Sequence, residues 1–330
     1  MRVAGSYDAS SLAPGRLPPP PVAARRALPF RVVGLITSDA RADGLPRWWA
    51  WWIFWVPLLG SVVVGGLRLD WPVYVWLLKE DHPVEWAQFG VMLFSTLVLA
   101  GVVRSAVRRR DVPVALLAGL MFVAFLFTTG EEISWGQRVL GLVTPQSLAG
   151  VNGQDELNVH DIRVGIPVES MINFSEMLFA ILVTVLPWVV RAPAPAGAFA
   201  RRTAWIRPRW LLLVCPPLHA GTGFALMAGY RFARFFLLPP SVEQSATVVV
   251  LKQWMEMGFY LSLTAMVVSL VGGLRRSQRQ RRRHRQSRHP ERAATGGGTL
   301  RPLLPHAVLA AVTTVVFALL TIRSGIAPGN

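Results

Sequence analysis

Two adjacent glutamates, Glu131 and Glu132, follow an apolar run where VPVALLAGLMFVAFLF ends in TTGEEISWGQR. Further along, QDELNVHD places Glu156 and His160 four positions apart, which is one face of a helix if the segment is helical. Carboxylate and imidazole groups at this spacing can bind a divalent metal ion or act as an acid and a base. The four side chains are therefore candidate catalytic residues, and Glu131, Glu132 and His160 are candidate metal ligands. Ordinary salt bridges to nearby arginines explain the Glu156 and His160 spacing about as well.

A second set of ionisable residues lies inside or at the ends of apolar runs, namely Glu85, Glu176, Lys252 and Glu256. Lys252 and Glu256 are four positions apart, so we expect them to form an ion pair near the middle of a membrane. Charged groups at membrane depth are costly, which makes each of these residues a candidate proton relay. A structural ion pair that only fixes helix register is the alternative for Lys252 and Glu256.

The composition predicts the setting in which these residues lie. The 330 residues are 52% hydrophobic and 16% charged, whereas soluble domains are about 25% charged. We therefore expect an all-α, polytopic membrane protein, a helical bundle of about seven transmembrane helices. The single cysteine, Cys215, excludes an intrachain disulfide and a cysteine-based metal cluster.

A membrane-spanning helix needs about 20 mostly apolar residues. Seven stretches meet this requirement: residues 48–67, 84–103, 113–132, 171–190, 209–229, 243–272 and 303–322. They form one membrane domain, residues 47–330, after a Pro- and Arg-rich tail at 1–46 that we expect to be disordered. Within the fifth stretch, Pro216 and Pro217 remove two backbone donors, so this helix must kink or break.

Most of the 34 basic residues fall in alternate connections, which fixes a predicted orientation, because short Arg-rich loops stay in the cytoplasm. The protein is expected in the bacterial plasma membrane, with its N-terminus cytoplasmic and its C-terminus extracytoplasmic. The Arg-rich segment 273–302 is then a cytoplasmic loop that contacts anionic lipid headgroups of the bilayer. Nucleic-acid binding is not expected, since no nucleic-acid-binding motif accompanies the arginines.

The segment EEISWGQR also resembles the signature of a group of bacterial polytopic membrane proteins that have no established activity. The resemblance extends over the matching residues Thr144, Pro145, Asn152, Gln154, Glu156, Asn158 and His160, and upstream over Glu80, Asp81 and Glu85. His82 stands where the group has Gly, and Asp161 where it has Asn, so local turns differ. The resemblance implies that the outer polar residues form one unit.

Three functions follow from these residues. The first is a metal-assisted, membrane-embedded enzyme that acts on a lipid or envelope substrate through Glu131, Glu132, Glu156 and His160. The second is a proton-coupled transporter that uses the intramembrane Glu and Lys residues. The third is a non-catalytic membrane assembly partner.

The orientation can be tested with topology reporters fused at loop positions. Fusions after residues 110, 200 and 285 should report a cytoplasmic location, and fusions after 75, 155 and 330 an external one. A cytoplasmic signal at 155 would contradict the predicted orientation, because the loop and both glutamates would then change sides.

Overall fold

The computed structural model describes residues 34, 36–37, 39–79, 82–146, 168–191, 215–239, 242, 246–286 and 303–324. Regular structure in these ranges is helical throughout. The elements, in chain order, are α2 (Arg47–Leu67), α3 (Trp71–Leu78), α4 (Pro83–Arg108), α5 (Val112–Glu131), η2 (Ser134–Gly136), α6 (Gln137–Leu140), α8 (Val168–Arg191), η5 (Leu218–Ala220), α11 (Gly221–Phe236), α13 (Ala246–Gln286) and α14 (Leu304–Ser324).

Five helical segments are long and apolar enough to cross a membrane. They are Arg47–Leu67, Trp71–Arg108, Val112–Glu131, Val168–Trp188 and Thr247–Arg276. The expected all-helical, membrane-type architecture is therefore supported. The seventh expected span contains a shorter apolar helix, the stretch Leu304–Leu320 of α14. The expected fifth span overlaps the 16-residue α11.

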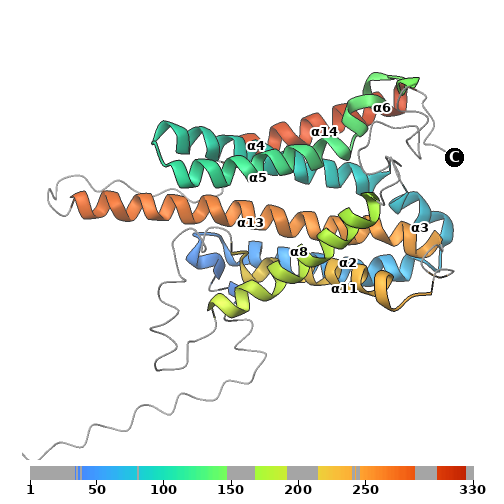
Figure 1. Cartoon of the computed structure of the whole chain (residues 1–330), viewed down its shortest axis with the longest axis horizontal. Helices are drawn as coiled ribbons and strands as arrows, with labels where there is room; N and C mark the ends of the chain where they lie inside the picture. Colours follow the sequence, from blue (N-terminus) through green and yellow to red (C-terminus); the bar gives the residue numbers. More distant parts are fainter. Residues whose placement is uncertain are drawn as a thin grey trace, which may run out of the picture.

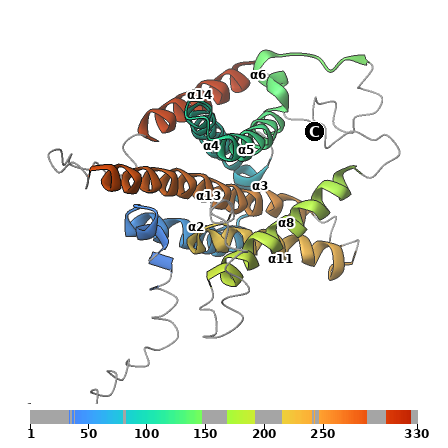
Figure 2. The same ribbon diagram turned by 60° about the vertical axis from the view of Figure 1, so that its left-hand side comes forward.

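The long helix α13 lies at the centre of the arrangement (Figures 1 and 2). Helices α4, α5 and α14 lie on one side of it, and α2, α8 and α11 on the other. In its apolar stretch 78% of the residues are buried, against 22% in α2, α5 and α8. This burial places α13 in the core of the bundle, between the two groups of helices.

Two polar side chains of α4 and a glycine of α11 lie close to α13. The Oγ atom of Ser95 on α4 lies 2.8 Å from the Thr264 hydroxyl on α13, and Gln88 donates to the backbone carbonyl of Gln253. On the other side, Gly223 of α11 faces Gly258 of α13 so closely that a Cβ on Gly223 would collide with the Gly258 carbonyl. Such contacts are typical of helix packing in membranes, where apolar surface alone gives little attraction between helices.

The chain is not helical at Pro216 and Pro217, where the sequence predicts a kink or break. The chain is extended at Pro217 and becomes helical at η5 and α11. The backbone N–H of Leu218, the first residue of η5, donates to Asp39 Oδ2 at 2.8 Å. The break is therefore stabilised by a residue from the N-terminal segment.

Three boundaries differ from the sequence expectation. Helix α11 continues to Phe236, seven residues beyond the expected end of its span. Helix α13 continues to Gln286, so the first part of the expected loop 273–302 is helical. The expected tail 1–46 is not disordered throughout, because Ile36, Ala40 and Leu45 are buried in the main apolar core. Burial of these apolar side chains contributes favourable free energy, which offsets the conformational entropy that the segment loses when it becomes ordered.

Because α11 and α13 approach closely at Gly223, a methyl group added to α11 should destabilise the protein there but not at a position that faces away from α13. Gly223→Ala should lower the free energy of unfolding by about 1 to 3 kcal/mol, because the added methyl overpacks the contact. Gly229→Ala is the matched control on α11, since its Cβ would meet no atom within 4 Å. Melting temperatures in detergent should fall for the first variant and stay level or rise for the second. Equal melting temperatures for the two variants would contradict this packing.

Candidate functional site

Arg231 on α11 is 2% exposed, so its guanidinium depends on protein partners. Its Nη2 lies 2.6 Å from Oε2 of Glu176 on α8, and its Nε donates to the same oxygen at 2.8 Å. The same Nη2 lies 3.2 Å from Oε1 of Glu256 on α13. One guanidinium thus joins three helices through two carboxylates.

Lys252 completes this group of charges. Its Nζ lies 3.5 Å from Oε1 of Glu256, the oxygen that also faces Arg231, so the predicted Lys252 and Glu256 pair is confirmed. The four side chains, Glu176, Arg231, Lys252 and Glu256, carry two positive and two negative formal charges, and we call them the ion-pair network. Because an unpaired buried charge is costly, a network whose charges cancel is one that an apolar bundle can hold.

A second polar contact lies one turn further along α13. The Tyr260 hydroxyl donates to Oε1 of Glu132 at 2.7 Å, which joins α13 to the end of α5. Lys252, Glu256 and Tyr260 follow one another at intervals of four residues, so their side chains recur along one face of α13. The polar face of α13 therefore contacts helices on both of its sides.

Glu131 is oriented differently from Glu132. The indole Nε1 of Trp135 donates to Glu131 Oε1 at 2.6 Å, within the turn that follows α5. Trp135 has a φ of 55°, and its ring packs over Gly130, where a Cβ would lie 2.8 Å from the ring. Glu131 is therefore tied to this turn, whereas Glu132 contacts α13 through Tyr260.

The structure brings together three of the four intramembrane candidates, Glu176, Lys252 and Glu256. Glu85 lies in the first turn of α4, where the helix dipole favours a carboxylate. Glu156 and His160 lie outside the described residues. Within the described ranges, no group of three His, Cys, Asp or Glu side chains could hold a metal ion.

Arg231 is the residue that sequence reasoning missed, because ending the fifth span at 229 places it in an outer loop. A signal was present in the spacing of α11. Its buried positions Gly223, Phe224, Met227 and Ala228 recur every three or four residues, and the next position in that series is Arg231. Extending this apolar stripe by one turn would have brought the arginine into the bundle.

Comparison of the chain with protein-family models, with curated proteins and with solved structures finds no match. The site must therefore be interpreted from its own geometry.

The ion-pair network predicts that two substitutions compensate each other. Arg231→Met should lower the free energy of unfolding by about 3 to 5 kcal/mol, because it leaves Glu176 buried without its cation. Adding Glu176→Gln removes that unpaired charge and leaves the neutral Lys252 and Glu256 pair, so part of the loss should be recovered.

Melting temperatures in detergent for the wild type, both single variants and the double variant give the coupling between the two sites. Arg231→Met combined with Glu169→Gln is the matched control, since Glu169 is exposed on the same helix, α8, two turns away. A double variant at 176 and 231 no more stable than Arg231→Met alone would contradict the network.

Proposed function

We propose that the chain is a bacterial plasma-membrane protein with seven spans, an N-terminus in the cytoplasm and a C-terminus outside. The directions of the helices support this topology. Side-chain neighbours make α4 parallel to α13 (Gln88 with Gln253, Ser95 with Thr264). They make α11 antiparallel to α13 (Tyr230 with Val248, Gly223 with Gly258). An alternating path of seven crossings requires these directions.

The charges support the same topology. Arg47 begins α2, Arg108 ends α4 and Arg276 lies in the last part of α13, and Arg276 donates to the backbone carbonyl of Arg41. These arginines therefore gather at one end of the bundle, which the positive-inside rule assigns to the cytoplasm. The ion-pair network then lies toward the opposite end, about 15 Å along α13 from its first residue.

We propose further that the protein is a proton-coupled membrane transporter. The observation that carries this function is the sharing of Arg231 by Glu176 and Glu256. Protonation of Glu256 would leave Arg231 with Glu176 alone and would leave Lys252 without its anion. Proton uptake therefore requires the ion pairs between α8, α11 and α13 to rearrange, and this couples a proton to helix movement.

The contacts on the other side of α13 fit the same function. Glu132 of α5 accepts from Tyr260, one turn from Glu256. Helices on both sides of α13 are thus held to its polar face by hydrogen bonds and ion pairs. A change in charge on this face would alter contacts with both groups of helices, which a carrier needs for alternating access.

The metal-assisted enzyme remains a second proposal. It needs Glu131, Glu132, Glu156 and His160 to meet around a divalent ion, yet Glu131 and Glu132 already accept hydrogen bonds from different elements. Transport is favoured because its residues are already in contact. Metal analysis of the purified protein tests the enzyme proposal directly.

Proton flux into liposomes tests the transport proposal. Under an imposed membrane potential the wild type should carry protons, and Glu176→Gln or Glu256→Gln should reduce the flux at least about tenfold, since each removes a titratable carboxylate of the network. Glu169→Gln, an exposed carboxylate on α8, is the matched control and should keep wild-type flux.

Melting temperature and proton flux together distinguish a transport role of Lys252 and Glu256 from a purely structural role. The double variant Lys252→Met with Glu256→Leu leaves Arg231 paired with Glu176, so it should melt near the wild-type temperature while carrying no protons. Full flux in Glu256→Gln, or no flux in the wild type, would contradict the transport proposal. The absence of flux in every form would leave the metal-assisted enzyme and the non-catalytic assembly partner as the remaining accounts.

A further inference from the structure

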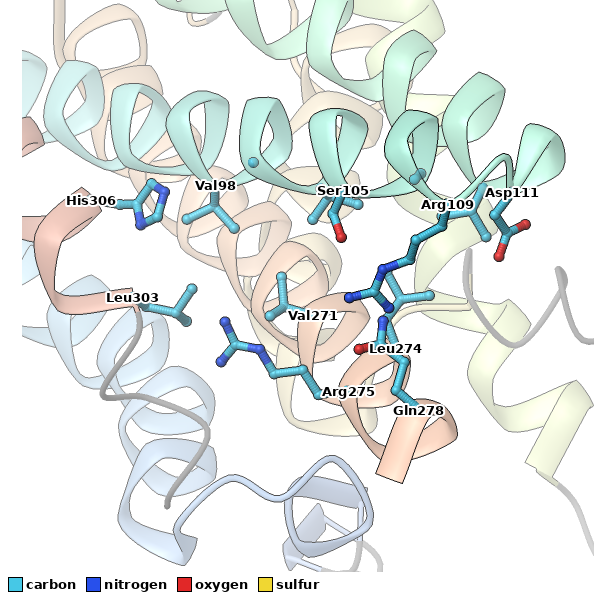
Figure 3. Close-up of a pocket in the computed structure, with 14 residues that line it drawn as sticks. Val98, Ser105, Arg109, Asp111, Val271, Leu274, Arg275, Gln278, Leu303 and His306 are labelled. Carbon is cyan, nitrogen blue, oxygen red and sulfur yellow. The ribbon is translucent and has the colours of Figure 1, made fainter. Parts of the chain in front are cut away.

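A pocket of about 430 Å³ lies at the arginine-rich end of the bundle, far along α13 from the ion-pair network. It is enclosed by α4, α13 and the starts of α5 and α14 (Figure 3). Its polar lining consists of Ser105, Arg109, Asp111, Arg275, Gln278 and His306. Its volume falls in the range of ligand-binding pockets, roughly 300 to 1,000 Å³.

The charges of the pocket favour an anion. Arg109 from α4 and Arg275 from α13 both extend into it (Figure 3). Asp111 is the one acidic side chain among the described residues that line it, so cationic side chains outnumber anionic ones. Guanidinium groups present several N–H donors in a plane and match the oxygens of a phosphate.

His306 provides an independent sign of a missing partner. Its Nδ1 atom is buried and has no hydrogen-bond partner in the described part of the chain. Buried polar atoms are nearly always hydrogen-bonded, so this nitrogen lacks a partner that such atoms normally have. His306 lies in the first turn of α14, where unpaired backbone N–H groups also favour an anion.

The remaining wall is apolar, which distinguishes the pocket from a site for a free inorganic ion. Val98 and Val102 of α4, Val271 of α13 and Leu303 line it and are themselves buried. A ligand that fills this volume must therefore present an anionic group to the arginines and an apolar part to the valines.

We propose that this pocket binds one anionic phospholipid molecule, with its phosphate between Arg109 and Arg275 and the start of an acyl chain against Val98 and Val102. Under the proposed topology the pocket opens at the cytoplasmic leaflet, where such a lipid is present. This binding differs from the general attraction of the Arg-rich segment for anionic membranes, because a pocket holds one molecule with defined contacts.

Native mass spectrometry of the full-length protein in detergent tests the proposal. The probes are phosphatidylglycerol, phosphatidylcholine and water-soluble glycerol 3-phosphate, each titrated separately. The pocket variant is Arg109→Gln with Arg275→Gln. The matched control is Arg104→Gln with Arg108→Gln, which removes the same charge from exposed positions of α4 that do not line the pocket.

We expect one phosphatidylglycerol per protein, bound at least about tenfold more weakly by the pocket variant and within about twofold of wild type by the control. Gly101→Val gives a second test without a change of charge, because a Cβ there points to His306 at 3.6 Å from Nε2 and the larger side chain would fill the cavity. It should weaken binding to the same extent, and it decides the test if the double variant does not fold.

Three outcomes would overturn the proposal. An equal loss in the control pair would show attraction to the basic surface only. Equal binding of phosphatidylcholine would remove the requirement for an anionic lipid. Binding of glycerol 3-phosphate as tight as that of phosphatidylglycerol would show that a free phosphate ester, and not a lipid, occupies the pocket.

Discussion

The sharing of Arg231 between Glu176 and Glu256 constrains much of the bundle. A guanidinium that is 2% exposed cannot be left without anions, so α8, α11 and α13 must approach at this level. The register of α11 against α13 is then fixed again by Gly223, which allows the two backbones to come close about two turns of α11 toward the other end. The two ion pairs of Arg231 and one small residue therefore set both the distance and the register of these helices.

The two ends of the bundle have different chemistry. Toward the outer end, under the proposed topology, the charges are paired with one another, as in Lys252 with Glu256. At the cytoplasmic end, arginines gather around a cavity with an apolar wall, and a buried histidine nitrogen lacks a partner among the described residues. Under the two proposals, the first arrangement takes up a proton and the second binds an anionic lipid. Helix α13 contributes residues to the ion-pair network and to the pocket, so one helix contacts both sites.

Several features could be predicted from sequence because they depend on local spacing. Apolar runs predicted the helices, four-residue spacing predicted the Lys252 and Glu256 pair, and two adjacent prolines predicted the break before α11. The contacts of Arg231 could not be obtained in this way, since Glu176 lies 55 residues away from it in the chain. Because Arg231 was counted as a loop residue, the predicted fifth span ended at 229, whereas α11 continues to Phe236. The adjacent Glu131 and Glu132 look like one site in sequence, but successive helical residues point in different directions.

The central claim is that the carboxylates of the ion-pair network take up a proton. Infrared difference spectroscopy of the protein in lipid, between neutral and acidic pH, observes this step as the appearance of a protonated carboxyl band. The account predicts a band that is lost or clearly reduced in Glu256→Gln and in Glu176→Gln and is unchanged in Glu169→Gln. A band of full intensity in both network variants would contradict the account.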